Sequence, residues 1–473
     1  MNKPTSASPL RPSACPGLWR IVPALDGGIC RIKLAGGSIT ATQAIAVADA
    51  AERYAGGVIE ATNRANLQIR GIGAEQDPMV ALLLSAGLGP KNPAGDDVRN
   101  LMLSPTAGID PQQLFDSRPL AAQILDTLQN ESRFHDLSPK FAISLDGGEA
   151  LMMREHPHDL WLSALEVDGE VLLAFGLAGC PAHDAPLGAV ALAEGHALVV
   201  AVLDAFLEIA RPDQTRMRHL LAAMPVEAFL QAVGQRLIGP LRRQACSHGG
   251  MELPNPVGAG LPAKALGVSH SGMEVPNPVG AGLPAKALGV YQQSVAGRVA
   301  VGAAVPLGRL DASMLRAVAQ LATEWGDGTL RLTPWQSVLL PNVPAEDATT
   351  VITRLLAAGL ICDAKQPLAN IIACTGSDGC IKGVADTKAD AVKLASLLGL
   401  HGLSLPVHLT ACSRTCAAAH IAPMTLLATR AGHYDLYFRD TQQPGFGALR
   451  ARDLTIEAVG ALFAADSRSS TDD

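Results

Sequence analysis

Apolar residues between positions 41 and 54 recur every three or four residues, which is the spacing that gives a helix one buried face. Thr40 is a suitable N-cap for this helix, and the glycine pair 56–57 is suited to end it. Two short apolar runs follow, at 58–62 and 67–72, with a polar turn between them. The pattern predicts a helix followed by a β-hairpin.

The same pattern returns in the second half of the chain. Sliding the sequence along itself superposes apolar, glycine and threonine positions, and one extra residue of offset superposes two leucine-rich segments, 82–88 and 354–360. Chance similarity between Ala- and Leu-rich helices is the alternative, but it does not account for the matched glycine and threonine. The chain is therefore predicted to be an internal duplication. The matched pairs are Ile39 and Leu310, Ala48 and Ala319, Ala51 and Ala322, Tyr54 and Trp325, Gly57 and Gly328, and Thr62 and Thr333.

A second, tandem repeat lies between the two halves. Residues 247–268 are followed at once by a nearly identical copy at 269–290. Both copies are rich in Gly and Pro and have no sustained helical or strand period. We expect a tolerated surface insertion, because extra loop length adds little to the cost of closing a chain. A partner-binding loop is the alternative.

The composition is that of a globular protein with several cores. At 473 residues the chain is long for one core, and charged residues make up only 17% against 48% hydrophobic ones. A net charge of -7 and an aromatic content of 4% argue against a nucleic-acid-binding surface. The start lacks an apolar segment with a cleavage site, and the apolar stretch 190–210 is interrupted by charged residues. We expect a cytoplasmic protein that binds neither nucleic acid nor a membrane.

Four of the nine cysteines form two close pairs. Cys374 and Cys380 enclose five residues; after a helical stretch, 387–400, and an extended one, Cys412 and Cys416 enclose three. Both pairs would lie in loops at one end of an α/β layer, where four thiolates can surround a box of iron and sulfide. A four-cysteine zinc site, whose pairs usually enclose about two to four residues, and buried structural thiols are the alternatives. The other cysteines, Cys15, Cys30, Cys180, Cys246 and Cys362, show no such pairing.

The cysteine spacing resembles the cluster motif of the sulfite and nitrite reductases. That resemblance implies a 4Fe-4S cluster on the four paired cysteines and a tetrapyrrole-binding pocket. It also implies an internally duplicated α+β fold with two pseudo-symmetric ferredoxin-like halves and two α/β lobes. The expected domains are a first ferredoxin-like half at 10–98, a first α/β lobe without a cluster at 99–246, the insertion at 247–290, a second ferredoxin-like half at 291–368, and an iron-sulfur-binding α/β lobe at 369–473.

Residues 62–72 resemble the segment with which this family reaches the carboxylates of its tetrapyrrole. Side chains at alternate positions, Arg64, Asn66, Gln68 and Arg70, are expected on one face of a strand. Guanidinium groups bind carboxylates through two hydrogen bonds, which suits a ligand with many acid groups. A solvated strand face is the alternative. The resemblance extends the substrate-binding set to Arg99, Asn100, Arg216 and Arg218.

The two copies differ at these positions. When the two copies are aligned, Trp335 matches Arg64 and Leu339 matches Gln68. The second half has therefore lost most of the anion-binding set. Conversely, Ser104 stands in the first half where the second has a cluster cysteine. We expect one half to bind the acid groups of the ligand and the other to bind the metal.

Residues 137–148 resemble a reductase segment that carries two active-site lysines. Lys140 matches the first lysine, which implies a catalytic role, but Ala142 stands at the second. Reduction of sulfite or nitrite needs cationic donors that bind a small anion and deliver protons, so the missing lysine disfavours that chemistry. Together with 62–72 and the cysteine motif, this segment most resembles the precorrin-3B synthase family.

That closer resemblance implies an oxygen-dependent monooxygenase of cobalamin biosynthesis, which hydroxylates precorrin-3A at C20 and closes a γ-lactone to give precorrin-3B. Implied partners are dioxygen and an external electron donor, NADH or a reductase. Implied cofactors are the 4Fe-4S cluster and a mononuclear non-haem iron. His156, His158 and Asp159 are a candidate iron site, although a polar turn explains them more simply, and His408 and His420 flank the cysteine motif.

Two rival functions follow from the same residues. A sirohaem-dependent sulfite or nitrite reductase would share the fold, and bound sirohaem would identify it. A non-catalytic iron-sulfur electron-transfer module would not need the arginines near position 64. Failure to bind any tetrapyrrole would favour that second rival.

Overall fold

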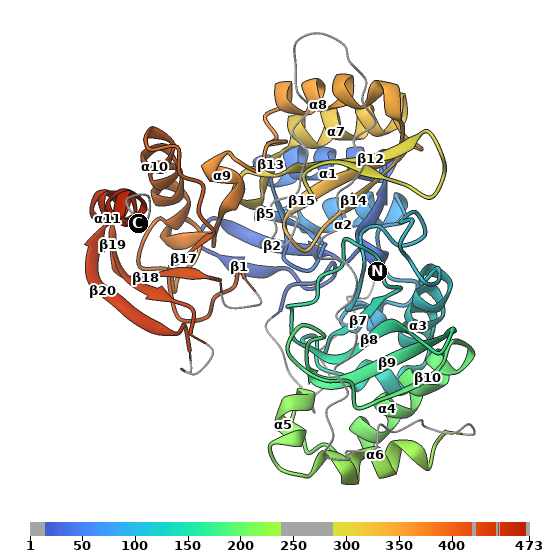
Figure 1. Ribbon diagram of the computed structural model, residues 1–473. Coiled ribbons are helices and arrows are strands. Elements are labelled where there is room, and N and C mark those ends of the chain that lie inside the picture. Colours follow the sequence, from blue (N-terminus) through green and yellow to red (C-terminus); the bar gives the residue numbers. More distant parts are fainter. Residues whose placement is uncertain (1–14, 238–286, 419–421, 441–442, 444, 470–473) are drawn as a thin grey trace.

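The computed structural model describes residues 15–237, 287–418, 422–440, 443 and 445–469. Within them the chain forms four five-stranded β-sheets in three bodies (Figure 1). The central body holds the two duplicated halves. The other two are the first lobe, which runs from β6 to α6, and the C-terminal lobe, which runs from α9 to α11.

The first half confirms the predicted helix and hairpin. The hydroxyl of Thr40 accepts a hydrogen bond from the backbone N–H of Gln43, and the Gln43 side chain accepts one from the backbone N–H of Thr40, so both ends of a capping box are present. The elements of this half are β1 (Val22–Ala24), β2 (Gly27–Ile32), β3 (Ser38–Thr40), α1 (Ala41–Tyr54), β4 (Val58–Ala61), β5 (Leu67–Ile72) and α2 (Gln76–Ser85).

The second half repeats this order, and the two halves exchange a strand. β13 pairs with β4 of the first half, while β3 of the first half pairs with β14. α1 and α7 pack together over the two sheets, and one hydrophobic core runs through both halves. The elements are β11 (Gly289–Gln292), β12 (Arg298–Ala304), β13 (Arg309–Asp311), α7 (Ala312–Trp325), β14 (Thr329–Leu332), β15 (Ser337–Pro344) and α8 (Ala348–Ala357).

The hairpin turns of the two halves have the same conformation. Ala65 (φ 54°) and Gln336 (φ 60°) occupy equivalent places and both take the left-handed conformation. The backbone N–H of each donates to the threonine three residues earlier, Thr62 or Thr333. Matching turn geometry and matching strand exchange confirm the internal duplication.

The first lobe has a sheet of strand order β10-β9-β8-β7-β6, in which β6, β7 and β8 run parallel, and a core of its own. Its elements are β6 (Leu101–Leu103), α3 (Arg118–Asn130), β7 (Ile143–Asp146), β8 (His158–Val167), β9 (Glu170–Gly179), β10 (Gly188–Ala191), α4 (Gly195–Ile209), α5 (Met217–Leu221) and α6 (Val226–Gly234).

The C-terminal lobe has the equivalent order, β16-β17-β18-β19-β20, with β16, β17 and β18 parallel. The predicted helix at 387–400 and the extended stretch before Cys412 are confirmed as α10 and β17. The elements are α9 (Pro367–Asn370), β16 (Ile371–Ala373), α10 (Thr387–Leu400), β17 (Val407–Thr410), β18 (Met424–Arg430), β19 (His433–Phe438), β20 (Ala448–Thr455) and α11 (Ile456–Ser469).

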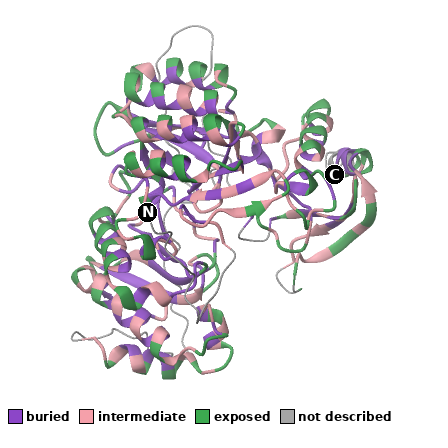
Figure 2. Cartoon of the chain, turned by 180° about the vertical axis from the view of Figure 1, so that it is seen from behind, coloured by how far each residue is buried: buried purple, intermediate pink, exposed green. Residues whose placement is uncertain are grey.

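Buried residues concentrate in the sheets and on the helix faces turned toward them (Figure 2). No helix in the described part of the chain is long and apolar enough to cross a membrane. The tandem repeat lies outside the described residues except for 287–290, so the surface insertion stays a prediction. The domain boundaries given above also stay predictions.

Candidate functional site

Local hydrogen bonds to the side chain of Thr62 stabilise the turn between β4 and β5. Its hydroxyl accepts from the backbone N–H groups of Arg64 (3.3 Å) and Asn66 (3.1 Å). Ala65, with its left-handed backbone, redirects the chain, and β5 begins only at Leu67. Arg64 therefore belongs to the turn and not to strand β5. The prediction that residues 64, 66, 68 and 70 share one strand face is wrong for the residues before β5.

Arg64 lines a small cavity together with the amino ends of three parallel strands. Because β6, β7 and β8 are parallel, Asn100, Ala142 and His158, which stand at or just before their first residues, meet at one sheet edge. The cavity volume is only about 10 Å³, far below the ~300–1,000 Å³ of pockets that enclose a small molecule. A ligand larger than a water molecule would lie against this cavity and not inside it. The lining comprises Arg64, Asn66, Arg99, Asn100, Leu101, Met102, Ala142, Ile143 and His158.

Asp159 fixes the wall behind this cavity. Only 1% of it is exposed, and its two oxygens accept from the Nε of Arg216 at 2.9 and 2.8 Å. The backbone N–H groups of Met217 (2.8 Å) and Ala142 (2.9 Å) also donate to it. Asp159 thus orients Arg216 and holds Ala142, and these hydrogen bonds use both of its oxygens.

The electrostatics of the cavity suit an anionic ligand. Burial, and then the nearby guanidiniums of Arg216 and Arg31, lower the pKa of Arg64 to about 10. At neutral pH the guanidiniums of Arg64, Arg31 and Arg216 are therefore held close together. Asp159 neutralises only that of Arg216, so a carboxylate at the cavity would stabilise the arrangement. Burial and then Arg64 lower the pKa of His158 to about 3, so this imidazole is neutral.

The amides of Asn66 and Asn100 are held by backbone groups. The Asn66 side-chain oxygen accepts from the backbone N–H of Leu34 (2.8 Å). The Asn100 side-chain nitrogen donates to the carbonyl oxygens of Asp97 and Pro139, both at 2.9 Å, and to that of Phe141. Both residues line the cavity, and their contact with a substrate stays a prediction.

Gln68 and Arg70 are also engaged within the protein. The side-chain oxygen of Gln68 accepts from Arg31 at 3.1 and 2.8 Å. Arg70, 5% exposed, makes two 2.9 Å hydrogen bonds to the carboxylate of Asp26 and donates to the carbonyl of Gly379 at 3.0 Å. The structure therefore favours an internal role for Arg70, as a link to the loop between Cys374 and Cys380.

The remaining predicted residues divide into cavity and surface. Arg99 lines the cavity and donates to Asp96 (3.2 Å). Lys140 and Arg218 are exposed, and neither is part of the lining. The catalytic role of Lys140 and the substrate contact of Arg218 stay predictions. Ala142, two residues after Lys140, does line the cavity.

The sequence analysis missed Arg31, which β2 places beside Gln68 of β5. Burial lowers the pKa of its guanidinium, and the nearby thiols of Cys15 and Cys416 act in the opposite direction. Arg31 therefore lies between the arginine cavity and the cysteine loops. Its place between Cys30 and Ile32, a charged residue between two apolar ones, is a signal that the sequence contained.

A buried acid, Glu60, was also missed. Burial opposes its ionisation, but Lys388, Arg70 and Arg309 together lower its pKa. Arg309 lies 3.1 Å from its carboxylate, and the hydroxyl of Thr375 donates to it at 3.3 Å. Glu60 thus links both halves to the loop that follows Cys374.

The paired cysteines lie at the carboxyl ends of two parallel strands. Cys374 follows β16 and Cys412 comes two residues after β17, so the two loops start side by side. The thiol of Cys374 accepts from the backbone N–H of Ala411 (3.3 Å) and lies 3.4 Å from the hydroxyl of Thr387. Hydrogen bonds of this kind to sulfur stabilise cluster thiolates.

The four thiols are close to one another. Burial raises the pKa of Cys416, and the nearness of Cys412, Cys374 and Cys380 raises it further. In the described part of the chain no three His, Cys, Asp or Glu side chains converge closely enough for a single metal ion. Four neighbouring thiols on two loops that start side by side fit the four-cysteine ligand set of an iron-sulfur cluster.

The candidate mononuclear iron site does not fit its residues. Asp159 is occupied by Arg216 and backbone N–H groups, and Nδ1 of His158 lies 2.8 Å from the carbonyl oxygen of His156. His408 is buried on β17, in the other lobe, and His420 lies outside the described residues.

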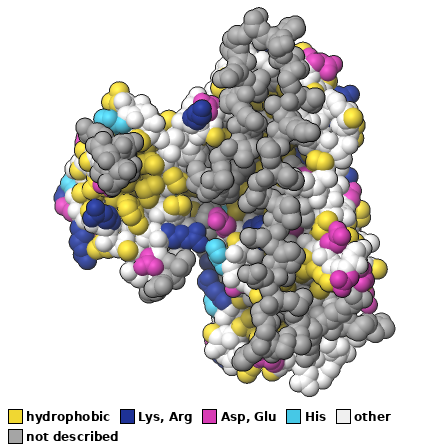
Figure 3. Space-filling model, viewed as in Figure 1, with side chains coloured by type: hydrophobic (Ala, Val, Ile, Leu, Met, Phe, Trp, Pro, Cys, Tyr) yellow, Lys and Arg dark blue, Asp and Glu magenta, His cyan; other side chains and the backbone are white. Residues whose placement is uncertain are grey.

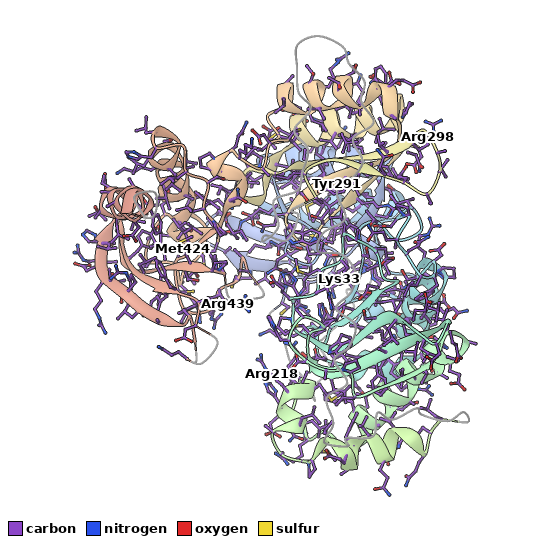
Figure 4. All side chains as sticks on the ribbon, in the orientation of Figure 1. Lys33, Arg218, Tyr291, Arg298, Met424 and Arg439 are labelled. Carbon is purple, nitrogen blue, oxygen red and sulfur yellow. The ribbon has the colours of Figure 1, made fainter. Side chains whose placement is uncertain are left out.

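The β4–β5 turn connects the cavity and the cysteine loops directly. Arg64 lines the cavity, while the side chain of Asn63 donates to the carbonyl of Cys416 (3.4 Å). Figure 3 shows Lys, Arg and His side chains along the hollow between the C-terminal lobe and the rest of the molecule. Figure 4 places Arg439 and Arg218 on either side of it, and Arg439 lies 2.9 Å from His183 of the first lobe.

Two family models match the chain. The model described as "Nitrite/Sulfite reductase ferredoxin-like half domain" matches 23–86 and 291–358, within the two duplicated halves. The model described as "Nitrite and sulphite reductase 4Fe-4S domain" matches 94–241, which is the first lobe. The four paired cysteines lie beyond that match, in the equivalent C-terminal lobe.

Similar proteins include both reductases and a tetrapyrrole-modifying enzyme. The chain is 28% identical to ferredoxin–nitrite reductase of Synechococcus elongatus (85% of this chain, 76% of the relative). It is 25% identical to precorrin-3B synthase of Sinorhizobium sp (90% and 82%), and 30% identical to the chloroplastic ferredoxin–nitrite reductase of Zea mays (83% and 68%).

Among solved structures, the NirA protein of Mycobacterium tuberculosis matches with a TM-score of 0.72 and 19% identity, over 93% of this chain and 80% of that one. This likeness confirms the predicted α+β fold with two duplicated halves and two lobes.

Proposed function

Because the chain belongs to the nitrite and sulfite reductase family and is an oxidoreductase with an iron-sulfur centre, we propose that its substrate is a carboxylated tetrapyrrole. More specifically, we propose the oxygen-dependent conversion of precorrin-3A to precorrin-3B. One atom of dioxygen would enter the substrate as the C20 hydroxyl, and two electrons and two protons would reduce the other to water.

The observation that carries this proposal is the wall of the cavity. It presents guanidiniums from Arg64 and Arg99 for carboxylates, and the rest of its lining includes Ala142 and a neutral His158. A small anion that loses oxygen needs cationic proton donors there. A large ligand that is bound through the carboxylates on its own periphery does not need such donors. The precorrin-3B synthase relative, which aligns over 90% of this chain, supports the same conclusion.

The residues divide the work between binding and positioning. Arg64 and Arg99, which line the cavity, bind substrate carboxylates through paired hydrogen bonds. Asp159 orients Arg216 behind them. The cluster on Cys374, Cys380, Cys412 and Cys416, when bound, supplies electrons from an external donor, and the β4–β5 turn keeps it beside the cavity. The donor itself, NADH or a reductase, is part of the proposal.

A sirohaem-dependent nitrite or sulfite reductase is the second candidate. It is favoured by the nitrite reductase relatives, which are as similar to this chain as the precorrin-3B synthase is. The same arginines would then bind sirohaem carboxylates. Ala142 argues against it, because reduction of nitrite or sulfite needs a cationic proton donor at the substrate.

The test separates the candidates by substrate. The purified protein, with its cluster, is supplied with precorrin-3A, dioxygen and a reductant, and separately with nitrite or sulfite and the same reductant. We expect precorrin-3B in the first reaction and no reduction in the second. Reduction of either anion, with sirohaem in the purified protein, would overturn the proposal, and failure to bind any tetrapyrrole would favour an electron-transfer module.

A further inference from the structure

We propose that His158 accepts a hydrogen bond from a ring N–H of the bound tetrapyrrole, and that it thereby selects a metal-free macrocycle over one that contains iron. The inference rests on the proposed function for its ligand class. It adds a specificity-determining residue that the motif resemblance did not include among the substrate contacts.

The geometry leaves one nitrogen of His158 for a ligand. His158 is the first residue of β8, it is 4% exposed, and it lines the cavity beside Arg64. Its Nδ1 lies 2.8 Å from the carbonyl oxygen of His156, which can only accept, so Nδ1 carries the hydrogen. Nε2 therefore has a lone pair, and it makes no hydrogen bond within the described part of the chain.

The surroundings keep this nitrogen an acceptor. Arg64 and Arg99, on the same wall, can only donate hydrogen bonds. Burial and the positive charge of Arg64 oppose protonation of the ring. No side chain or backbone group in the described part of the chain donates to Nε2, so a ligand that donates at this point would gain a hydrogen bond.

The chemistry of the ligand class identifies the donor. The carboxylates of a tetrapyrrole are ionised at neutral pH and only accept hydrogen bonds. The remaining polar groups of a metal-free macrocycle are its ring nitrogens, some of which carry hydrogen. In sirohaem the iron replaces those hydrogens, so the same ring has no donor to offer. His158 can therefore distinguish two macrocycles that have identical acid groups.

The experiment uses sirohaem and its metal-free macrocycle as probes, titrated anaerobically into the full-length protein with its cluster. His158→Phe removes the acceptor and keeps an aromatic ring, while His158→Asn keeps an acceptor oxygen. His433→Phe is the matched control, since Nδ1 of His433 lies 3.1 Å from the carbonyl oxygen of Ala431, two residues earlier, but in the other lobe. Cluster absorption and circular dichroism verify that each variant is folded.

We expect His158→Phe to weaken binding of the metal-free macrocycle about 3- to 10-fold, the value of one neutral hydrogen bond. Sirohaem binding should change less than about twofold on the same scale. His158→Asn should recover most of the loss, and His433→Phe should change neither. Equal losses for both probes, or no loss for the metal-free one, would overturn the inference. So would an imidazole-ligated iron spectrum of bound sirohaem that His158→Phe abolishes.

Failure of the proposed function has a different signature. A wild-type protein that binds neither macrocycle contradicts both the proposed function and this inference. A wild-type protein that binds the metal-free macrocycle, with His158→Phe binding it equally well, contradicts only the role of His158.

Discussion

Arg64 and Arg218 make a direct comparison at the scale of single residues. Arg64 lines the cavity, whereas Arg218 is exposed and lies outside it. Loss of a partly buried ion pair costs about 2–5 kcal/mol, so Arg64→Ala should weaken binding of a carboxylated tetrapyrrole at least ~30-fold. Arg218→Ala should weaken it less than about threefold, because exposed ion pairs contribute little. Titration followed by absorbance measures both, and equal effects would show that the cavity is misassigned.

The raised pKa of Glu149 should make the free energy of unfolding depend on pH. Glu149 is fully buried, and burial, followed by the nearby Asp146, raises its pKa from 4.5 to about 7. A group with a raised folded-state pKa binds its proton more tightly in the folded protein, so stability falls as pH rises from about 4.5 to 7. Glu149→Gln removes this loss.

The variant should therefore be more stable than the wild type at pH 8, by up to about 3 kcal/mol, and show little gain at pH 4. Denaturant unfolding at the two pH values measures the difference. Glu75→Gln, at an exposed position, is the control. A gain that is the same at both pH values would contradict the account.

Residue chemistry was predictable from the sequence where it depended on local spacing. The cysteine pairs and the arginine near position 64 were found because their spacing is a property of the chain. The role of Arg70 was not, because Asp26 and Gly379, its partners, are distant in sequence. The position of Arg64 was misjudged because the left-handed Ala65 ends the alternation, and alanine gives no sign of such a turn.

At the scale of elements, the exchanged strands β3 and β13 join the two halves. Leu310 of β13 is 1% exposed and pairs with Ile59 of β4. The two sheets therefore cannot separate without breaking a shared core. We expect the central body to unfold in one transition.

Leu310→Ala tests this joint. Removing a buried leucine side chain should cost about 2–5 kcal/mol, whereas Leu356→Ala on α8, where the residue is 45% exposed, should cost less than about 1 kcal/mol. Unfolding in denaturant, followed by circular dichroism, measures both. A small effect of Leu310→Ala, or separate unfolding of the halves, would contradict the shared core.

Helices and hairpins followed from the sequence pattern because their periods are local. The strand exchange did not, since β3 and β13 are three residues each and have no period of their own. Their partners are set by the packing of α1 against α7, which brings the halves together. The duplication could be predicted from the sequence. The exchange of β3 and β13 between the two halves is seen only in the strand pairing of the structure.

At the scale of the whole molecule, the amino edge of one lobe sheet meets the carboxyl edge of the other across the β4–β5 turn. Under the proposed function, the duplicated lobes have diverged, one toward ligand acids and the other toward metal. Replacing Cys380 or Cys412 by serine should therefore abolish most cluster absorption and activity, because a missing thiolate exposes iron to solvent. Iron content and the visible spectrum measure this. Cys180→Ser, in the first lobe, should leave both unchanged, and a full cluster in either of the first two variants would refute the ligand set.

The most direct test of the central claim is the mass of the product formed from precorrin-3A under isotopically labelled dioxygen, with a reductant and the purified protein. The account predicts a product that carries one labelled oxygen atom, formed only when dioxygen and electrons are both supplied. Unchanged precorrin-3A, in a protein that instead reduces nitrite or sulfite, would contradict it.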